Sequence, residues 1–330
     1  MMGTPALLRV APSRLSRKSI RVICCVTKSA RAALHTTCVK TPGGLAYDLH
    51  EPTAKPQEIG SQPPIIFLHG LFGSKRNNQS ICNNPSTVAM ANSELRRVLS
   101  RDLNTRVYAL DLRNHGDSFH HDDHDYSVMA EDVSAFIKDN KLGDVTIIGH
   151  SMGAKTAMNL ALREPDLVAN LISVDNAPVL SPINKEFSEY IRGMVEVEAA
   201  GVTNRVNADE RLQQFVPSLA VRQFLLANLY RAQGSPKLRF RISLDTLQRS
   251  LGKLGEFPEC DGERQPFVKP SLFIRGSKSN YIKDEMLTSI GHLFPKFRLV
   301  DVDAGHWLIS EQPEAFRQEV LDFLGASTKK

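Results

Sequence analysis

Long hydrophobic runs are missing from this sequence. No apolar stretch reaches the roughly 18 residues needed to cross a bilayer, so we expect no transmembrane segment. The apolar run from Val22 to Val26 is short and is flanked by Arg21 and Lys28, which is a poor match to a secretory signal. The pattern therefore disfavours both membrane insertion and export.

Cysteine is also scarce. The 330-residue chain has five cysteines, and Cys24, Cys25 and Cys38 lie in or beside a basic N-terminal segment. The other two, Cys82 and Cys260, are far apart and show no Cys-x-x-Cys spacing. They predict neither a disulfide framework nor a zinc site. We expect a reduced protein that needs no metal.

An excess of charge of one sign is absent from most of the chain. The formal net charge is +5, but eight cations precede the first acidic residue, Asp48, and the chain without them carries −3. Charge therefore gives no support for a nucleic-acid or anionic-membrane partner. The eight residues are Arg9, Arg14, Arg17, Lys18, Arg21, Lys28, Arg31 and Lys40.

The N-terminus is rich in Arg, Ser and Ala and has no acid, a composition typical of a mitochondrial transit peptide. We predict such a peptide over residues 1–35, and with it a mitochondrial location. A disordered basic tail is the alternative interpretation.

Strands alternate with helices through most of the remaining sequence. The continuous apolar run Ile65 to Leu68 is typical of a strand buried on both faces of a parallel sheet. The alternation predicts an α/β fold with a doubly wound, mostly parallel sheet, formed by residues 36–180 and 267–330. Val39 to Asp48 reads as an edge hairpin. Further strands are expected at 107–110, 145–148, 171–174, 271–274 and 297–302, and helices at 92–103, 129–140 and 313–324.

The alternation stops over residues 181–266. This part has amphipathic helical spacing, and we expect helices there without strands. A run of helices inserted between two strands of one sheet is typical of a lid. The expected helices are 187–199, 211–215, 221–231 and 244–254.

The motif Gly149-His150-Ser151-Met152-Gly153 follows an apolar run that predicts a strand, and it precedes a segment that favours a helix. In that context Gly-x-Ser-x-Gly predicts a nucleophile elbow, in which a strained turn exposes the serine hydroxyl. A serine hydroxyl needs a base within hydrogen-bond reach. His306 directly follows the last predicted strand, at the same sheet edge as the elbow, and is the predicted base. His69 and His115 are weaker alternatives, because each sits in a Gly-flanked turn where a histidine more often fixes the loop.

These motifs carry a family resemblance. His69-Gly70-x-x-Gly73, Asp111-x-Arg113-x-His115-Gly116-x-Ser118, the elbow and Gly305-His306-Trp307 occur in the order seen in α/β-hydrolase-fold enzymes. The longer sequence segments around these motifs resemble those of the mitochondrial subfamily that holds the α/β-hydrolase domain-containing protein 11 enzymes and the yeast ethanol acetyltransferases. The resemblance covers roughly residues 40–325 and implies that fold with an inserted helical lid.

The acidic partner of His306 is less evident. In most enzymes of this fold the acidic residue follows the strand that is predicted here at 271–274. The segment after that strand, Gly276 to Tyr281, has no carboxylate. Asp175 ends the preceding strand, and the resembled acetyltransferases take their acid from that position. We therefore predict Asp175. Asp284 is the alternative, although an acidic residue at a helix start has a simpler role beside the helix dipole.

Developing oxyanion charge needs preorganised donors. The backbone N–H of Met152, directly after the nucleophile, is one, and Leu71 in the loop after the Ile65 strand is the best candidate for the second. Lys155 lies one helical turn beyond Ser151, where a structural contact is the simpler expectation.

Together these residues predict a serine esterase or thioesterase that forms an acyl-enzyme on Ser151, acts on a small acyl ester or thioester and needs no cofactor. An alcohol O-acetyltransferase, moving an acetyl group from acetyl-CoA to ethanol with the same residues, is the alternative. A non-catalytic scaffold that protects a mitochondrial protein partner is a third reading.

Overall fold

The computed structural model describes residues 36–39, 44–52, 62–76, 92–181, 183, 185–258 and 265–327. The predicted transit peptide and the side chains of Cys82 and Cys260 lie outside this part of the chain. Eight strands form one sheet in the order β1-β2-β4-β3-β5-β6-β9-β10. They are β1 (Thr36–Val39), β2 (Tyr47–His50), β3 (Ile65–Leu68), β4 (Val107–Leu110), β5 (Val145–His150), β6 (Val168–Val174), β9 (Ser271–Gly276) and β10 (Phe297–Val302).

Strands β4, β3, β5, β6, β9 and β10 run parallel, and β1 and β2 form the predicted antiparallel edge hairpin. All four side chains of β3 are buried, and they face two different cores. Ile65 and Phe67 join one apolar cluster, whereas Ile66 and Leu68 join the other. This alternation follows from the two-residue period of a strand, and explains why a sheet covered on both faces needs a continuous apolar run.

Helices cover both faces of the sheet. Apolar residues of α1 (Asn92–Asp102) and α10 (Pro313–Ser327) belong to the cluster that holds Ile65. Those of α2 (Tyr126–Asp139) and α3 (Met152–Arg163) belong to the cluster that holds Ile66. The predicted α/β fold with a mostly parallel sheet is confirmed. The remaining short elements of the core are η2 (Pro165–Leu167), between α3 and β6, and η3 (Asp284–Met286), α8 (Leu287–Leu293) and α9 (Leu308–Glu311) nearer the C-terminus.

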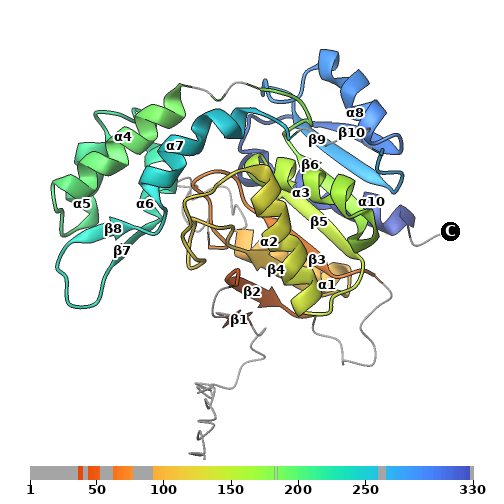
Figure 1. Cartoon of the computed structure of the whole chain (residues 1–330), viewed down its shortest axis with the longest axis horizontal. Helices are drawn as coiled ribbons and strands as arrows, with labels where there is room; N and C mark the ends of the chain where they lie inside the picture. The colour runs from red at the N-terminus through yellow and green to blue at the C-terminus, as the bar shows by residue number, and fades with distance from the viewer. Residues whose placement is uncertain are drawn as a thin grey trace, which may run out of the picture. The chain divides into compact units, whose positions relative to one another are not determined.

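A separate group of elements is inserted between β6 and β9, and is drawn in green to cyan beside the sheet in Figure 1. The elements are α4 (Glu186–Ala199), α5 (Arg205–Leu212), α6 (Leu219–Leu226), β7 (Leu229–Arg231), β8 (Leu238–Phe240) and α7 (Leu244–Gly255). Below, "the insertion" means residues 185–258.

The expectation of an insertion without strands is wrong. β7 and β8 pair as a short antiparallel hairpin. The apolar residues of β7 continue the helical spacing of α6, so the predicted helix 221–231 ran through both elements, whereas α6 ends at Leu226. The helix expected at 211–215 overlaps only the last two residues of α5, which begins at Arg205 and ends at Leu212. Asn204 starts it by accepting a hydrogen bond from the N–H of Asn207, as an N-cap residue does.

Among the described residues, every helix is too short or too polar to cross a membrane.

Candidate active site

Ser151 sits between β5 and α3 in a strained conformation, with φ 55° and ψ −114°. The flanking glycines are required by close backbone approach. A Cβ at Gly149 would lie 2.2 Å from the carbonyl oxygen of Gly153, and a Cβ at Gly153 would lie 2.6 Å from that of Leu68. The turn therefore has the geometry predicted for a nucleophile elbow, and it presents the hydroxyl at the carboxyl edge of the sheet.

His306 and Asp175 meet Ser151 at this edge. His306 Nε2 lies 2.9 Å from Ser151 Oγ, and His306 Nδ1 lies 2.7 Å from Asp175 Oδ2. A carboxylate accepts a hydrogen bond, so the ring carries its proton on Nδ1, and Nε2 is left to accept the serine hydroxyl. The three residues come from the ends of β5 and β6 and from the loop after β10. The structure thus brings together the three residues that the sequence analysis selected.

The Asp175 carboxylate is completely buried, and the end of β9 and the loop after it each supply one donor to it. The N–H of Gly276 donates to Oδ1 at 3.1 Å, and Ser279 Oγ donates to Oδ2 at 2.5 Å. This loop is the one that lacks a carboxylate in the sequence. Its role here is to hold the acid of the neighbouring strand. Sequence reasoning missed Ser279, because no motif marks a serine that acts through another residue.

Asp284, the alternative acid, lies elsewhere. It begins η3, its side chain is 84% exposed, and it accepts a hydrogen bond from Arg275 Nη1 at 2.6 Å. An exposed carboxylate in an ion pair with another residue is not available to His306, so the geometry favours Asp175.

Two aromatic residues fix His306. The Tyr281 ring stacks on it, with centroids 3.8 Å apart and planes inclined by 16°. The other, His150, donates from Nε2 to the carbonyl oxygen of His306 at 2.8 Å. Burial, and then the nearby His306, lower the pKa of His150 to about 4, so it stays neutral near pH 7. Neither contact was predicted from the sequence.

The loop after β3, residues 69–76 and called the β3 loop below, contains Leu71. The carbonyl oxygen of Gly70 accepts hydrogen bonds from Gly73 N and from His69 Nδ1, both at 2.8 Å. In a trans peptide the carbonyl and the next N–H point in opposite directions. Fixing the Gly70 carbonyl therefore also fixes the direction of the Leu71 N–H.

His69 and His115 hold loops rather than act as bases. His69 Nε2 accepts from the N–H of Leu112 at 3.0 Å, which leaves the proton on Nδ1. His115 has the same arrangement, with Nδ1–H donating to the Arg113 carbonyl at 2.9 Å and Nε2 accepting from the N–H of Phe72 at 3.2 Å. Burial lowers the pKa of His69 to about 4 and that of His115 well below its ordinary value.

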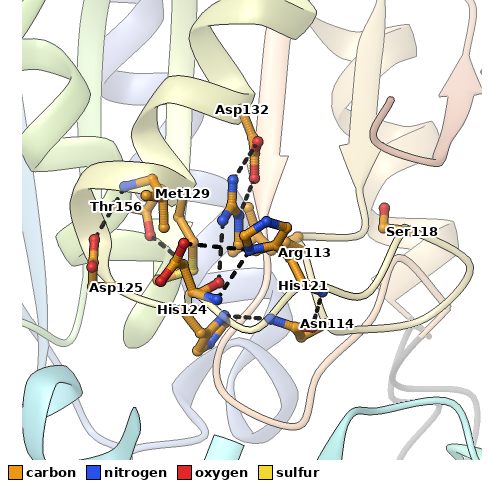
Figure 2. Close-up of polar contacts among 12 residues, drawn as sticks. Arg113, Asn114, Ser118, His121, His124, Asp125, Met129, Asp132 and Thr156 are labelled. Carbon is orange, nitrogen blue, oxygen red and sulfur yellow. Dashed lines mark hydrogen bonds and ion pairs between the residues drawn. The ribbon is translucent and has the colours of Figure 1, made fainter. Parts of the chain in front are cut away.

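The motif at 111–118 forms the loop after β4, and Figure 2 shows its contacts with α2 and the segment before it. Arg113 makes two hydrogen bonds to the Asp132 carboxylate, at 2.5 and 2.8 Å, and its Nη1 donates to the Asp123 carbonyl at 3.1 Å. The Asn114 side chain lies between His124 and the N–H of His121 (Figure 2). This motif is therefore a scaffold that carries His115.

Gly116 and Asp111 connect that scaffold to the β3 loop. Gly116 has φ +57°, and a Cβ there would lie 2.2 Å from the Asp111 carboxylate. The carboxylate accepts from the N–H groups of Lys75 and Asp117, and pairs with Lys75 Nζ. Burial alone would lower the pKa of Lys75, but Asp111 and Asp117 raise it, so the buried ammonium stays charged.

Lys155 makes the structural contact that was expected of it. Its ammonium is buried and donates to the carbonyl oxygens of Gly255 and Glu256, at 3.1 and 2.9 Å. Tyr126 donates to the carbonyl of Leu254 at 2.7 Å. A cation near the C-terminal carbonyls of α7 is stabilised by the helix dipole. Burial nevertheless lowers the pKa of Lys155 to about 8.

Two hollows adjoin Ser151 and His306. A cavity of about 20 Å³ lies beside Ser151, which is room for one water molecule. An open groove of about 630 Å³ reaches His306. The cavity is lined by Leu71, Tyr126, Met152, Ile183, Phe187 and Tyr281 among others, and the groove by Leu180, Ser279, Lys278, Lys283 and Met286 among others. Within the described residues, no group of three or more His, Cys, Asp or Glu could hold a metal ion.

The mostly parallel sheet, the nucleophile elbow and the hydrogen bonds that join Ser151, His306 and Asp175 together define an α/β hydrolase. A family model described as "alpha/beta hydrolase fold" matches residues 63–313. The chain therefore belongs to the α/β-hydrolase fold family, and the predicted family resemblance is confirmed.

Two proteins of similar sequence and one solved structure resemble the chain over most of its length. The chain is 40% identical to a "probable alcohol acetyltransferase" of Saccharomyces cerevisiae, over 91% of this chain and 90% of that protein. It is 38% identical to the sn-1-specific diacylglycerol lipase ABHD11 of Mus musculus, over 79% and 81%. Among solved structures, a marine microorganism esterase shares 33% identity with a TM-score of 0.71, covering 85% of this chain and 99% of that one.

Proposed function

We propose that this protein is a serine hydrolase of carboxylic esters and thioesters that forms an acyl-enzyme on Ser151. The observation that carries the proposal is the hydrogen-bonded chain from Asp175 through His306 to Ser151 Oγ. His306 Nε2 takes the hydroxyl proton as Ser151 attacks the acyl carbon, and then gives that proton to the leaving group. Asp175 holds the ring in the required tautomer.

The oxyanion is held by the backbone N–H groups of Met152 and Leu71. Met152 begins α3, directly after the nucleophile, and the direction of the Leu71 N–H is set by the two donors on the Gly70 carbonyl. Each such donor contributes roughly 3 to 4 kcal/mol to the stability of the transition state. Residues 181–266 act as the lid over this site, and apolar side chains such as Ile183 and Phe187 exclude water from it.

The test is kinetic. Ser151→Ala and His306→Ala should each abolish hydrolysis of p-nitrophenyl acetate and of a short acyl thioester, and the double variant should be no worse than either alone, because the residues act as a unit. Circular dichroism should show that the fold is retained. Substantial turnover by Ser151→Ala would exclude the acyl-enzyme.

Acyl transfer to an alcohol is the second candidate, favoured by the 40% identity to the yeast protein named as an alcohol acetyltransferase. Water and an alcohol compete for the same acyl-enzyme, and a site that holds the alcohol in attacking position gains several kcal/mol of effective concentration. We expect hydrolysis by default, with ester formation rising as ethanol is added to an acetyl thioester assay. Ester that dominates at millimolar ethanol would reverse this ranking, and no ester at molar ethanol would exclude the transferase.

A mitochondrial location belongs to the same proposal. It is supported by the eight cations that precede the first acidic residue and by the resemblance to a mitochondrial subfamily. Residues 1–35 fused to a fluorescent reporter should direct it to mitochondria. A reporter that stays in the cytosol would remove this part of the proposal.

A further inference from the structure

We infer that Asn228, in the insertion, is a positioning residue for the β3 loop, and that it couples docking of the insertion to alignment of the Leu71 N–H. This inference rests on the proposed acyl-enzyme chemistry. It concerns a residue that does not line the cavity beside Ser151 and that acts through the backbone of Phe72.

Phe72 directly follows Leu71 and has φ +60°, in the left-handed region that residues with a side chain seldom adopt. Its backbone is held at both polar groups. The N–H donates to His115 Nε2 at 3.2 Å, and the carbonyl oxygen accepts from Asn228 Nδ2 at 2.8 Å. A strained residue keeps such a conformation only where its surroundings enforce it. His115 does so from the core of the molecule, and Asn228 does so from the insertion.

Asn228 is itself well fixed. It lies between α6 and β7, is 2% exposed and donates its backbone N–H to the carbonyl of Leu225 at 3.1 Å. Its own carbonyl accepts from the N–H of Arg241 at 2.9 Å, just after β8. The side-chain amide is therefore carried by the base of the β7–β8 hairpin. Its position follows the position of the insertion.

Other contacts join the insertion to the same loop. The Phe187 ring, on α4, lies 5.9 Å from the Phe72 ring. Arg241 Nη1 pairs with Asp117 Oδ1 at 2.6 Å, and Asp117 Oδ2 accepts from Lys75 Nζ at 2.9 Å. The middle of the β3 loop therefore contacts the insertion directly, and Lys75 near its end is linked to the insertion through Asp117. When the insertion moves off the core, the Phe72 carbonyl loses its Asn228 donor. The N–H at the other end of the same peptide is that of Gly73, which is one of the two donors on the Gly70 carbonyl. The direction of the Leu71 N–H is then held by the His69 donor alone.

The consequence is that the second oxyanion donor is fully constrained only when the insertion is docked. Such coupling would protect the acyl-enzyme, because full transition-state stabilisation would arise only in the closed, water-poor site. It also gives a role to the buried Asn228 amide. A buried donor matches a carbonyl oxygen that needs a fixed direction.

The test replaces Asn228 with leucine, which has the same number of side-chain heavy atoms but no donor. The matched control is Asn159→Leu. Asn159, on α3, is also fully buried and donates from Nδ2 to a backbone carbonyl, that of Tyr126, at 3.1 Å. Both variants lose a buried amide that donates to backbone carbonyls, and Asn228 Nδ2 also donates to the Leu225 carbonyl at 3.3 Å. Only the Asn228 amide acts on the β3 loop. Asn228→Ala is the second variant at the same position, should leucine prevent folding.

Rates are expressed per active site, counted by exhaustive labelling with a fluorophosphonate. We expect Asn228→Leu to lower kcat/KM for p-nitrophenyl acetate by about 10- to 100-fold, mainly through kcat, since it disturbs one oxyanion donor without removing it. The inhibition constant of a trifluoromethyl ketone, whose adduct places an oxyanion in the same hole, should rise by the same factor. Asn159→Leu should lower the melting temperature to a similar extent and leave both constants within about twofold.

A purely structural role would lower the melting temperature and the number of active sites without changing either constant per site. Constants for Asn228→Leu and Asn228→Ala that match those of the Asn159 control would therefore overturn the inference. Ser151→Ala, run in parallel, separates this result from failure of the proposed function. If Ser151→Ala remains active, the acyl-enzyme itself is wrong. If it is inactive while the Asn228 variants are normal, only the coupling is wrong.

Discussion

Replacing Asp175 with asparagine is expected to lower kcat by about 10⁴-fold, a factor taken from the serine-protease triad, where the same substitution leaves the imidazole in the wrong tautomer. The carboxylate is fully buried and receives three donors: His306 Nδ1 at 2.7 Å, Ser279 Oγ at 2.5 Å and Gly276 N at 3.1 Å. An asparagine has only one acceptor oxygen. Its NH₂ group must therefore face at least one of these donors.

Two orientations of the amide are possible. If its NH₂ group faces His306, the ring must accept on Nδ1 and carry its proton on Nε2, where it can no longer take a proton from Ser151. If the NH₂ group faces the Gly276 N–H instead, two donors oppose each other in a buried site, which costs about 1 to 3 kcal/mol. The first orientation costs activity, about 5.5 kcal/mol of activation free energy for a factor of 10⁴. The second costs stability.

Steady-state hydrolysis of p-nitrophenyl acetate, together with a urea unfolding curve, measures both effects. Asp284→Asn is the matched control, because its carboxylate is exposed and pairs with Arg275. Surface pairs of this kind contribute little, so we expect a change of less than about twofold in kcat. Near-wild-type rates for Asp175→Asn, with a large loss for Asp284→Asn, would refute the assignment of the acid.

Three further predictions concern the neighbouring residues. Ser279→Ala removes one donor to a buried carboxylate and should lower kcat about tenfold, whereas Ser277→Ala, at an exposed site, should not. Gly153→Ala should lower the free energy of unfolding by about 1 to 3 kcal/mol in urea titrations, because its Cβ would lie 2.6 Å from a backbone oxygen. Lys155 has a folded-state pKa of about 8 against 10.5, so the unfolded chain binds more protons between these values. The stability of the wild type relative to Lys155→Met should therefore rise with pH over this window, by up to about 3 kcal/mol. A stability difference between wild type and Lys155→Met that does not change with pH would contradict the third prediction. An unchanged free energy of unfolding for Gly153→Ala would contradict the second, and equal kcat values for Ser279→Ala and Ser277→Ala would contradict the first.

Much of the fold could be predicted, because buried parallel strands leave a strong local pattern. Ile65–Leu68, for example, is both the predicted apolar run and the observed β3. The β7–β8 hairpin could not be predicted in this way. Each strand has only three residues, and Leu229 continues the apolar spacing of the helix before it, so the local pattern did not show where the helix ends.

In the candidate site, too, the residues that stand in local motifs could be predicted, and those that act through distant contacts could not. Ser151 and His306 stand in local motifs beside strand ends, and the structure brings both to one edge of the sheet, with Asp175 between β6 and the loop after β9. Ser279, Tyr281 and Asn228 could not have been selected from the sequence. Each acts through a contact with a distant segment, and the Asn228–Phe72 hydrogen bond joins residues 156 positions apart. Such contacts depend on how the loops fold over the sheet, and no local pattern encodes them.

Mass spectrometry of the acyl-enzyme is the most direct test of the central claim. The protein would be mixed with a slowly hydrolysed acyl ester, quenched in acid and digested, and the acyl group would be located by peptide sequencing. The account predicts one acylated peptide, modified on Ser151, which is missing from Ser151→Ala and accumulates in Asp175→Asn only slowly. An acyl group on another residue, or undiminished acylation of Ser151→Ala, would contradict it.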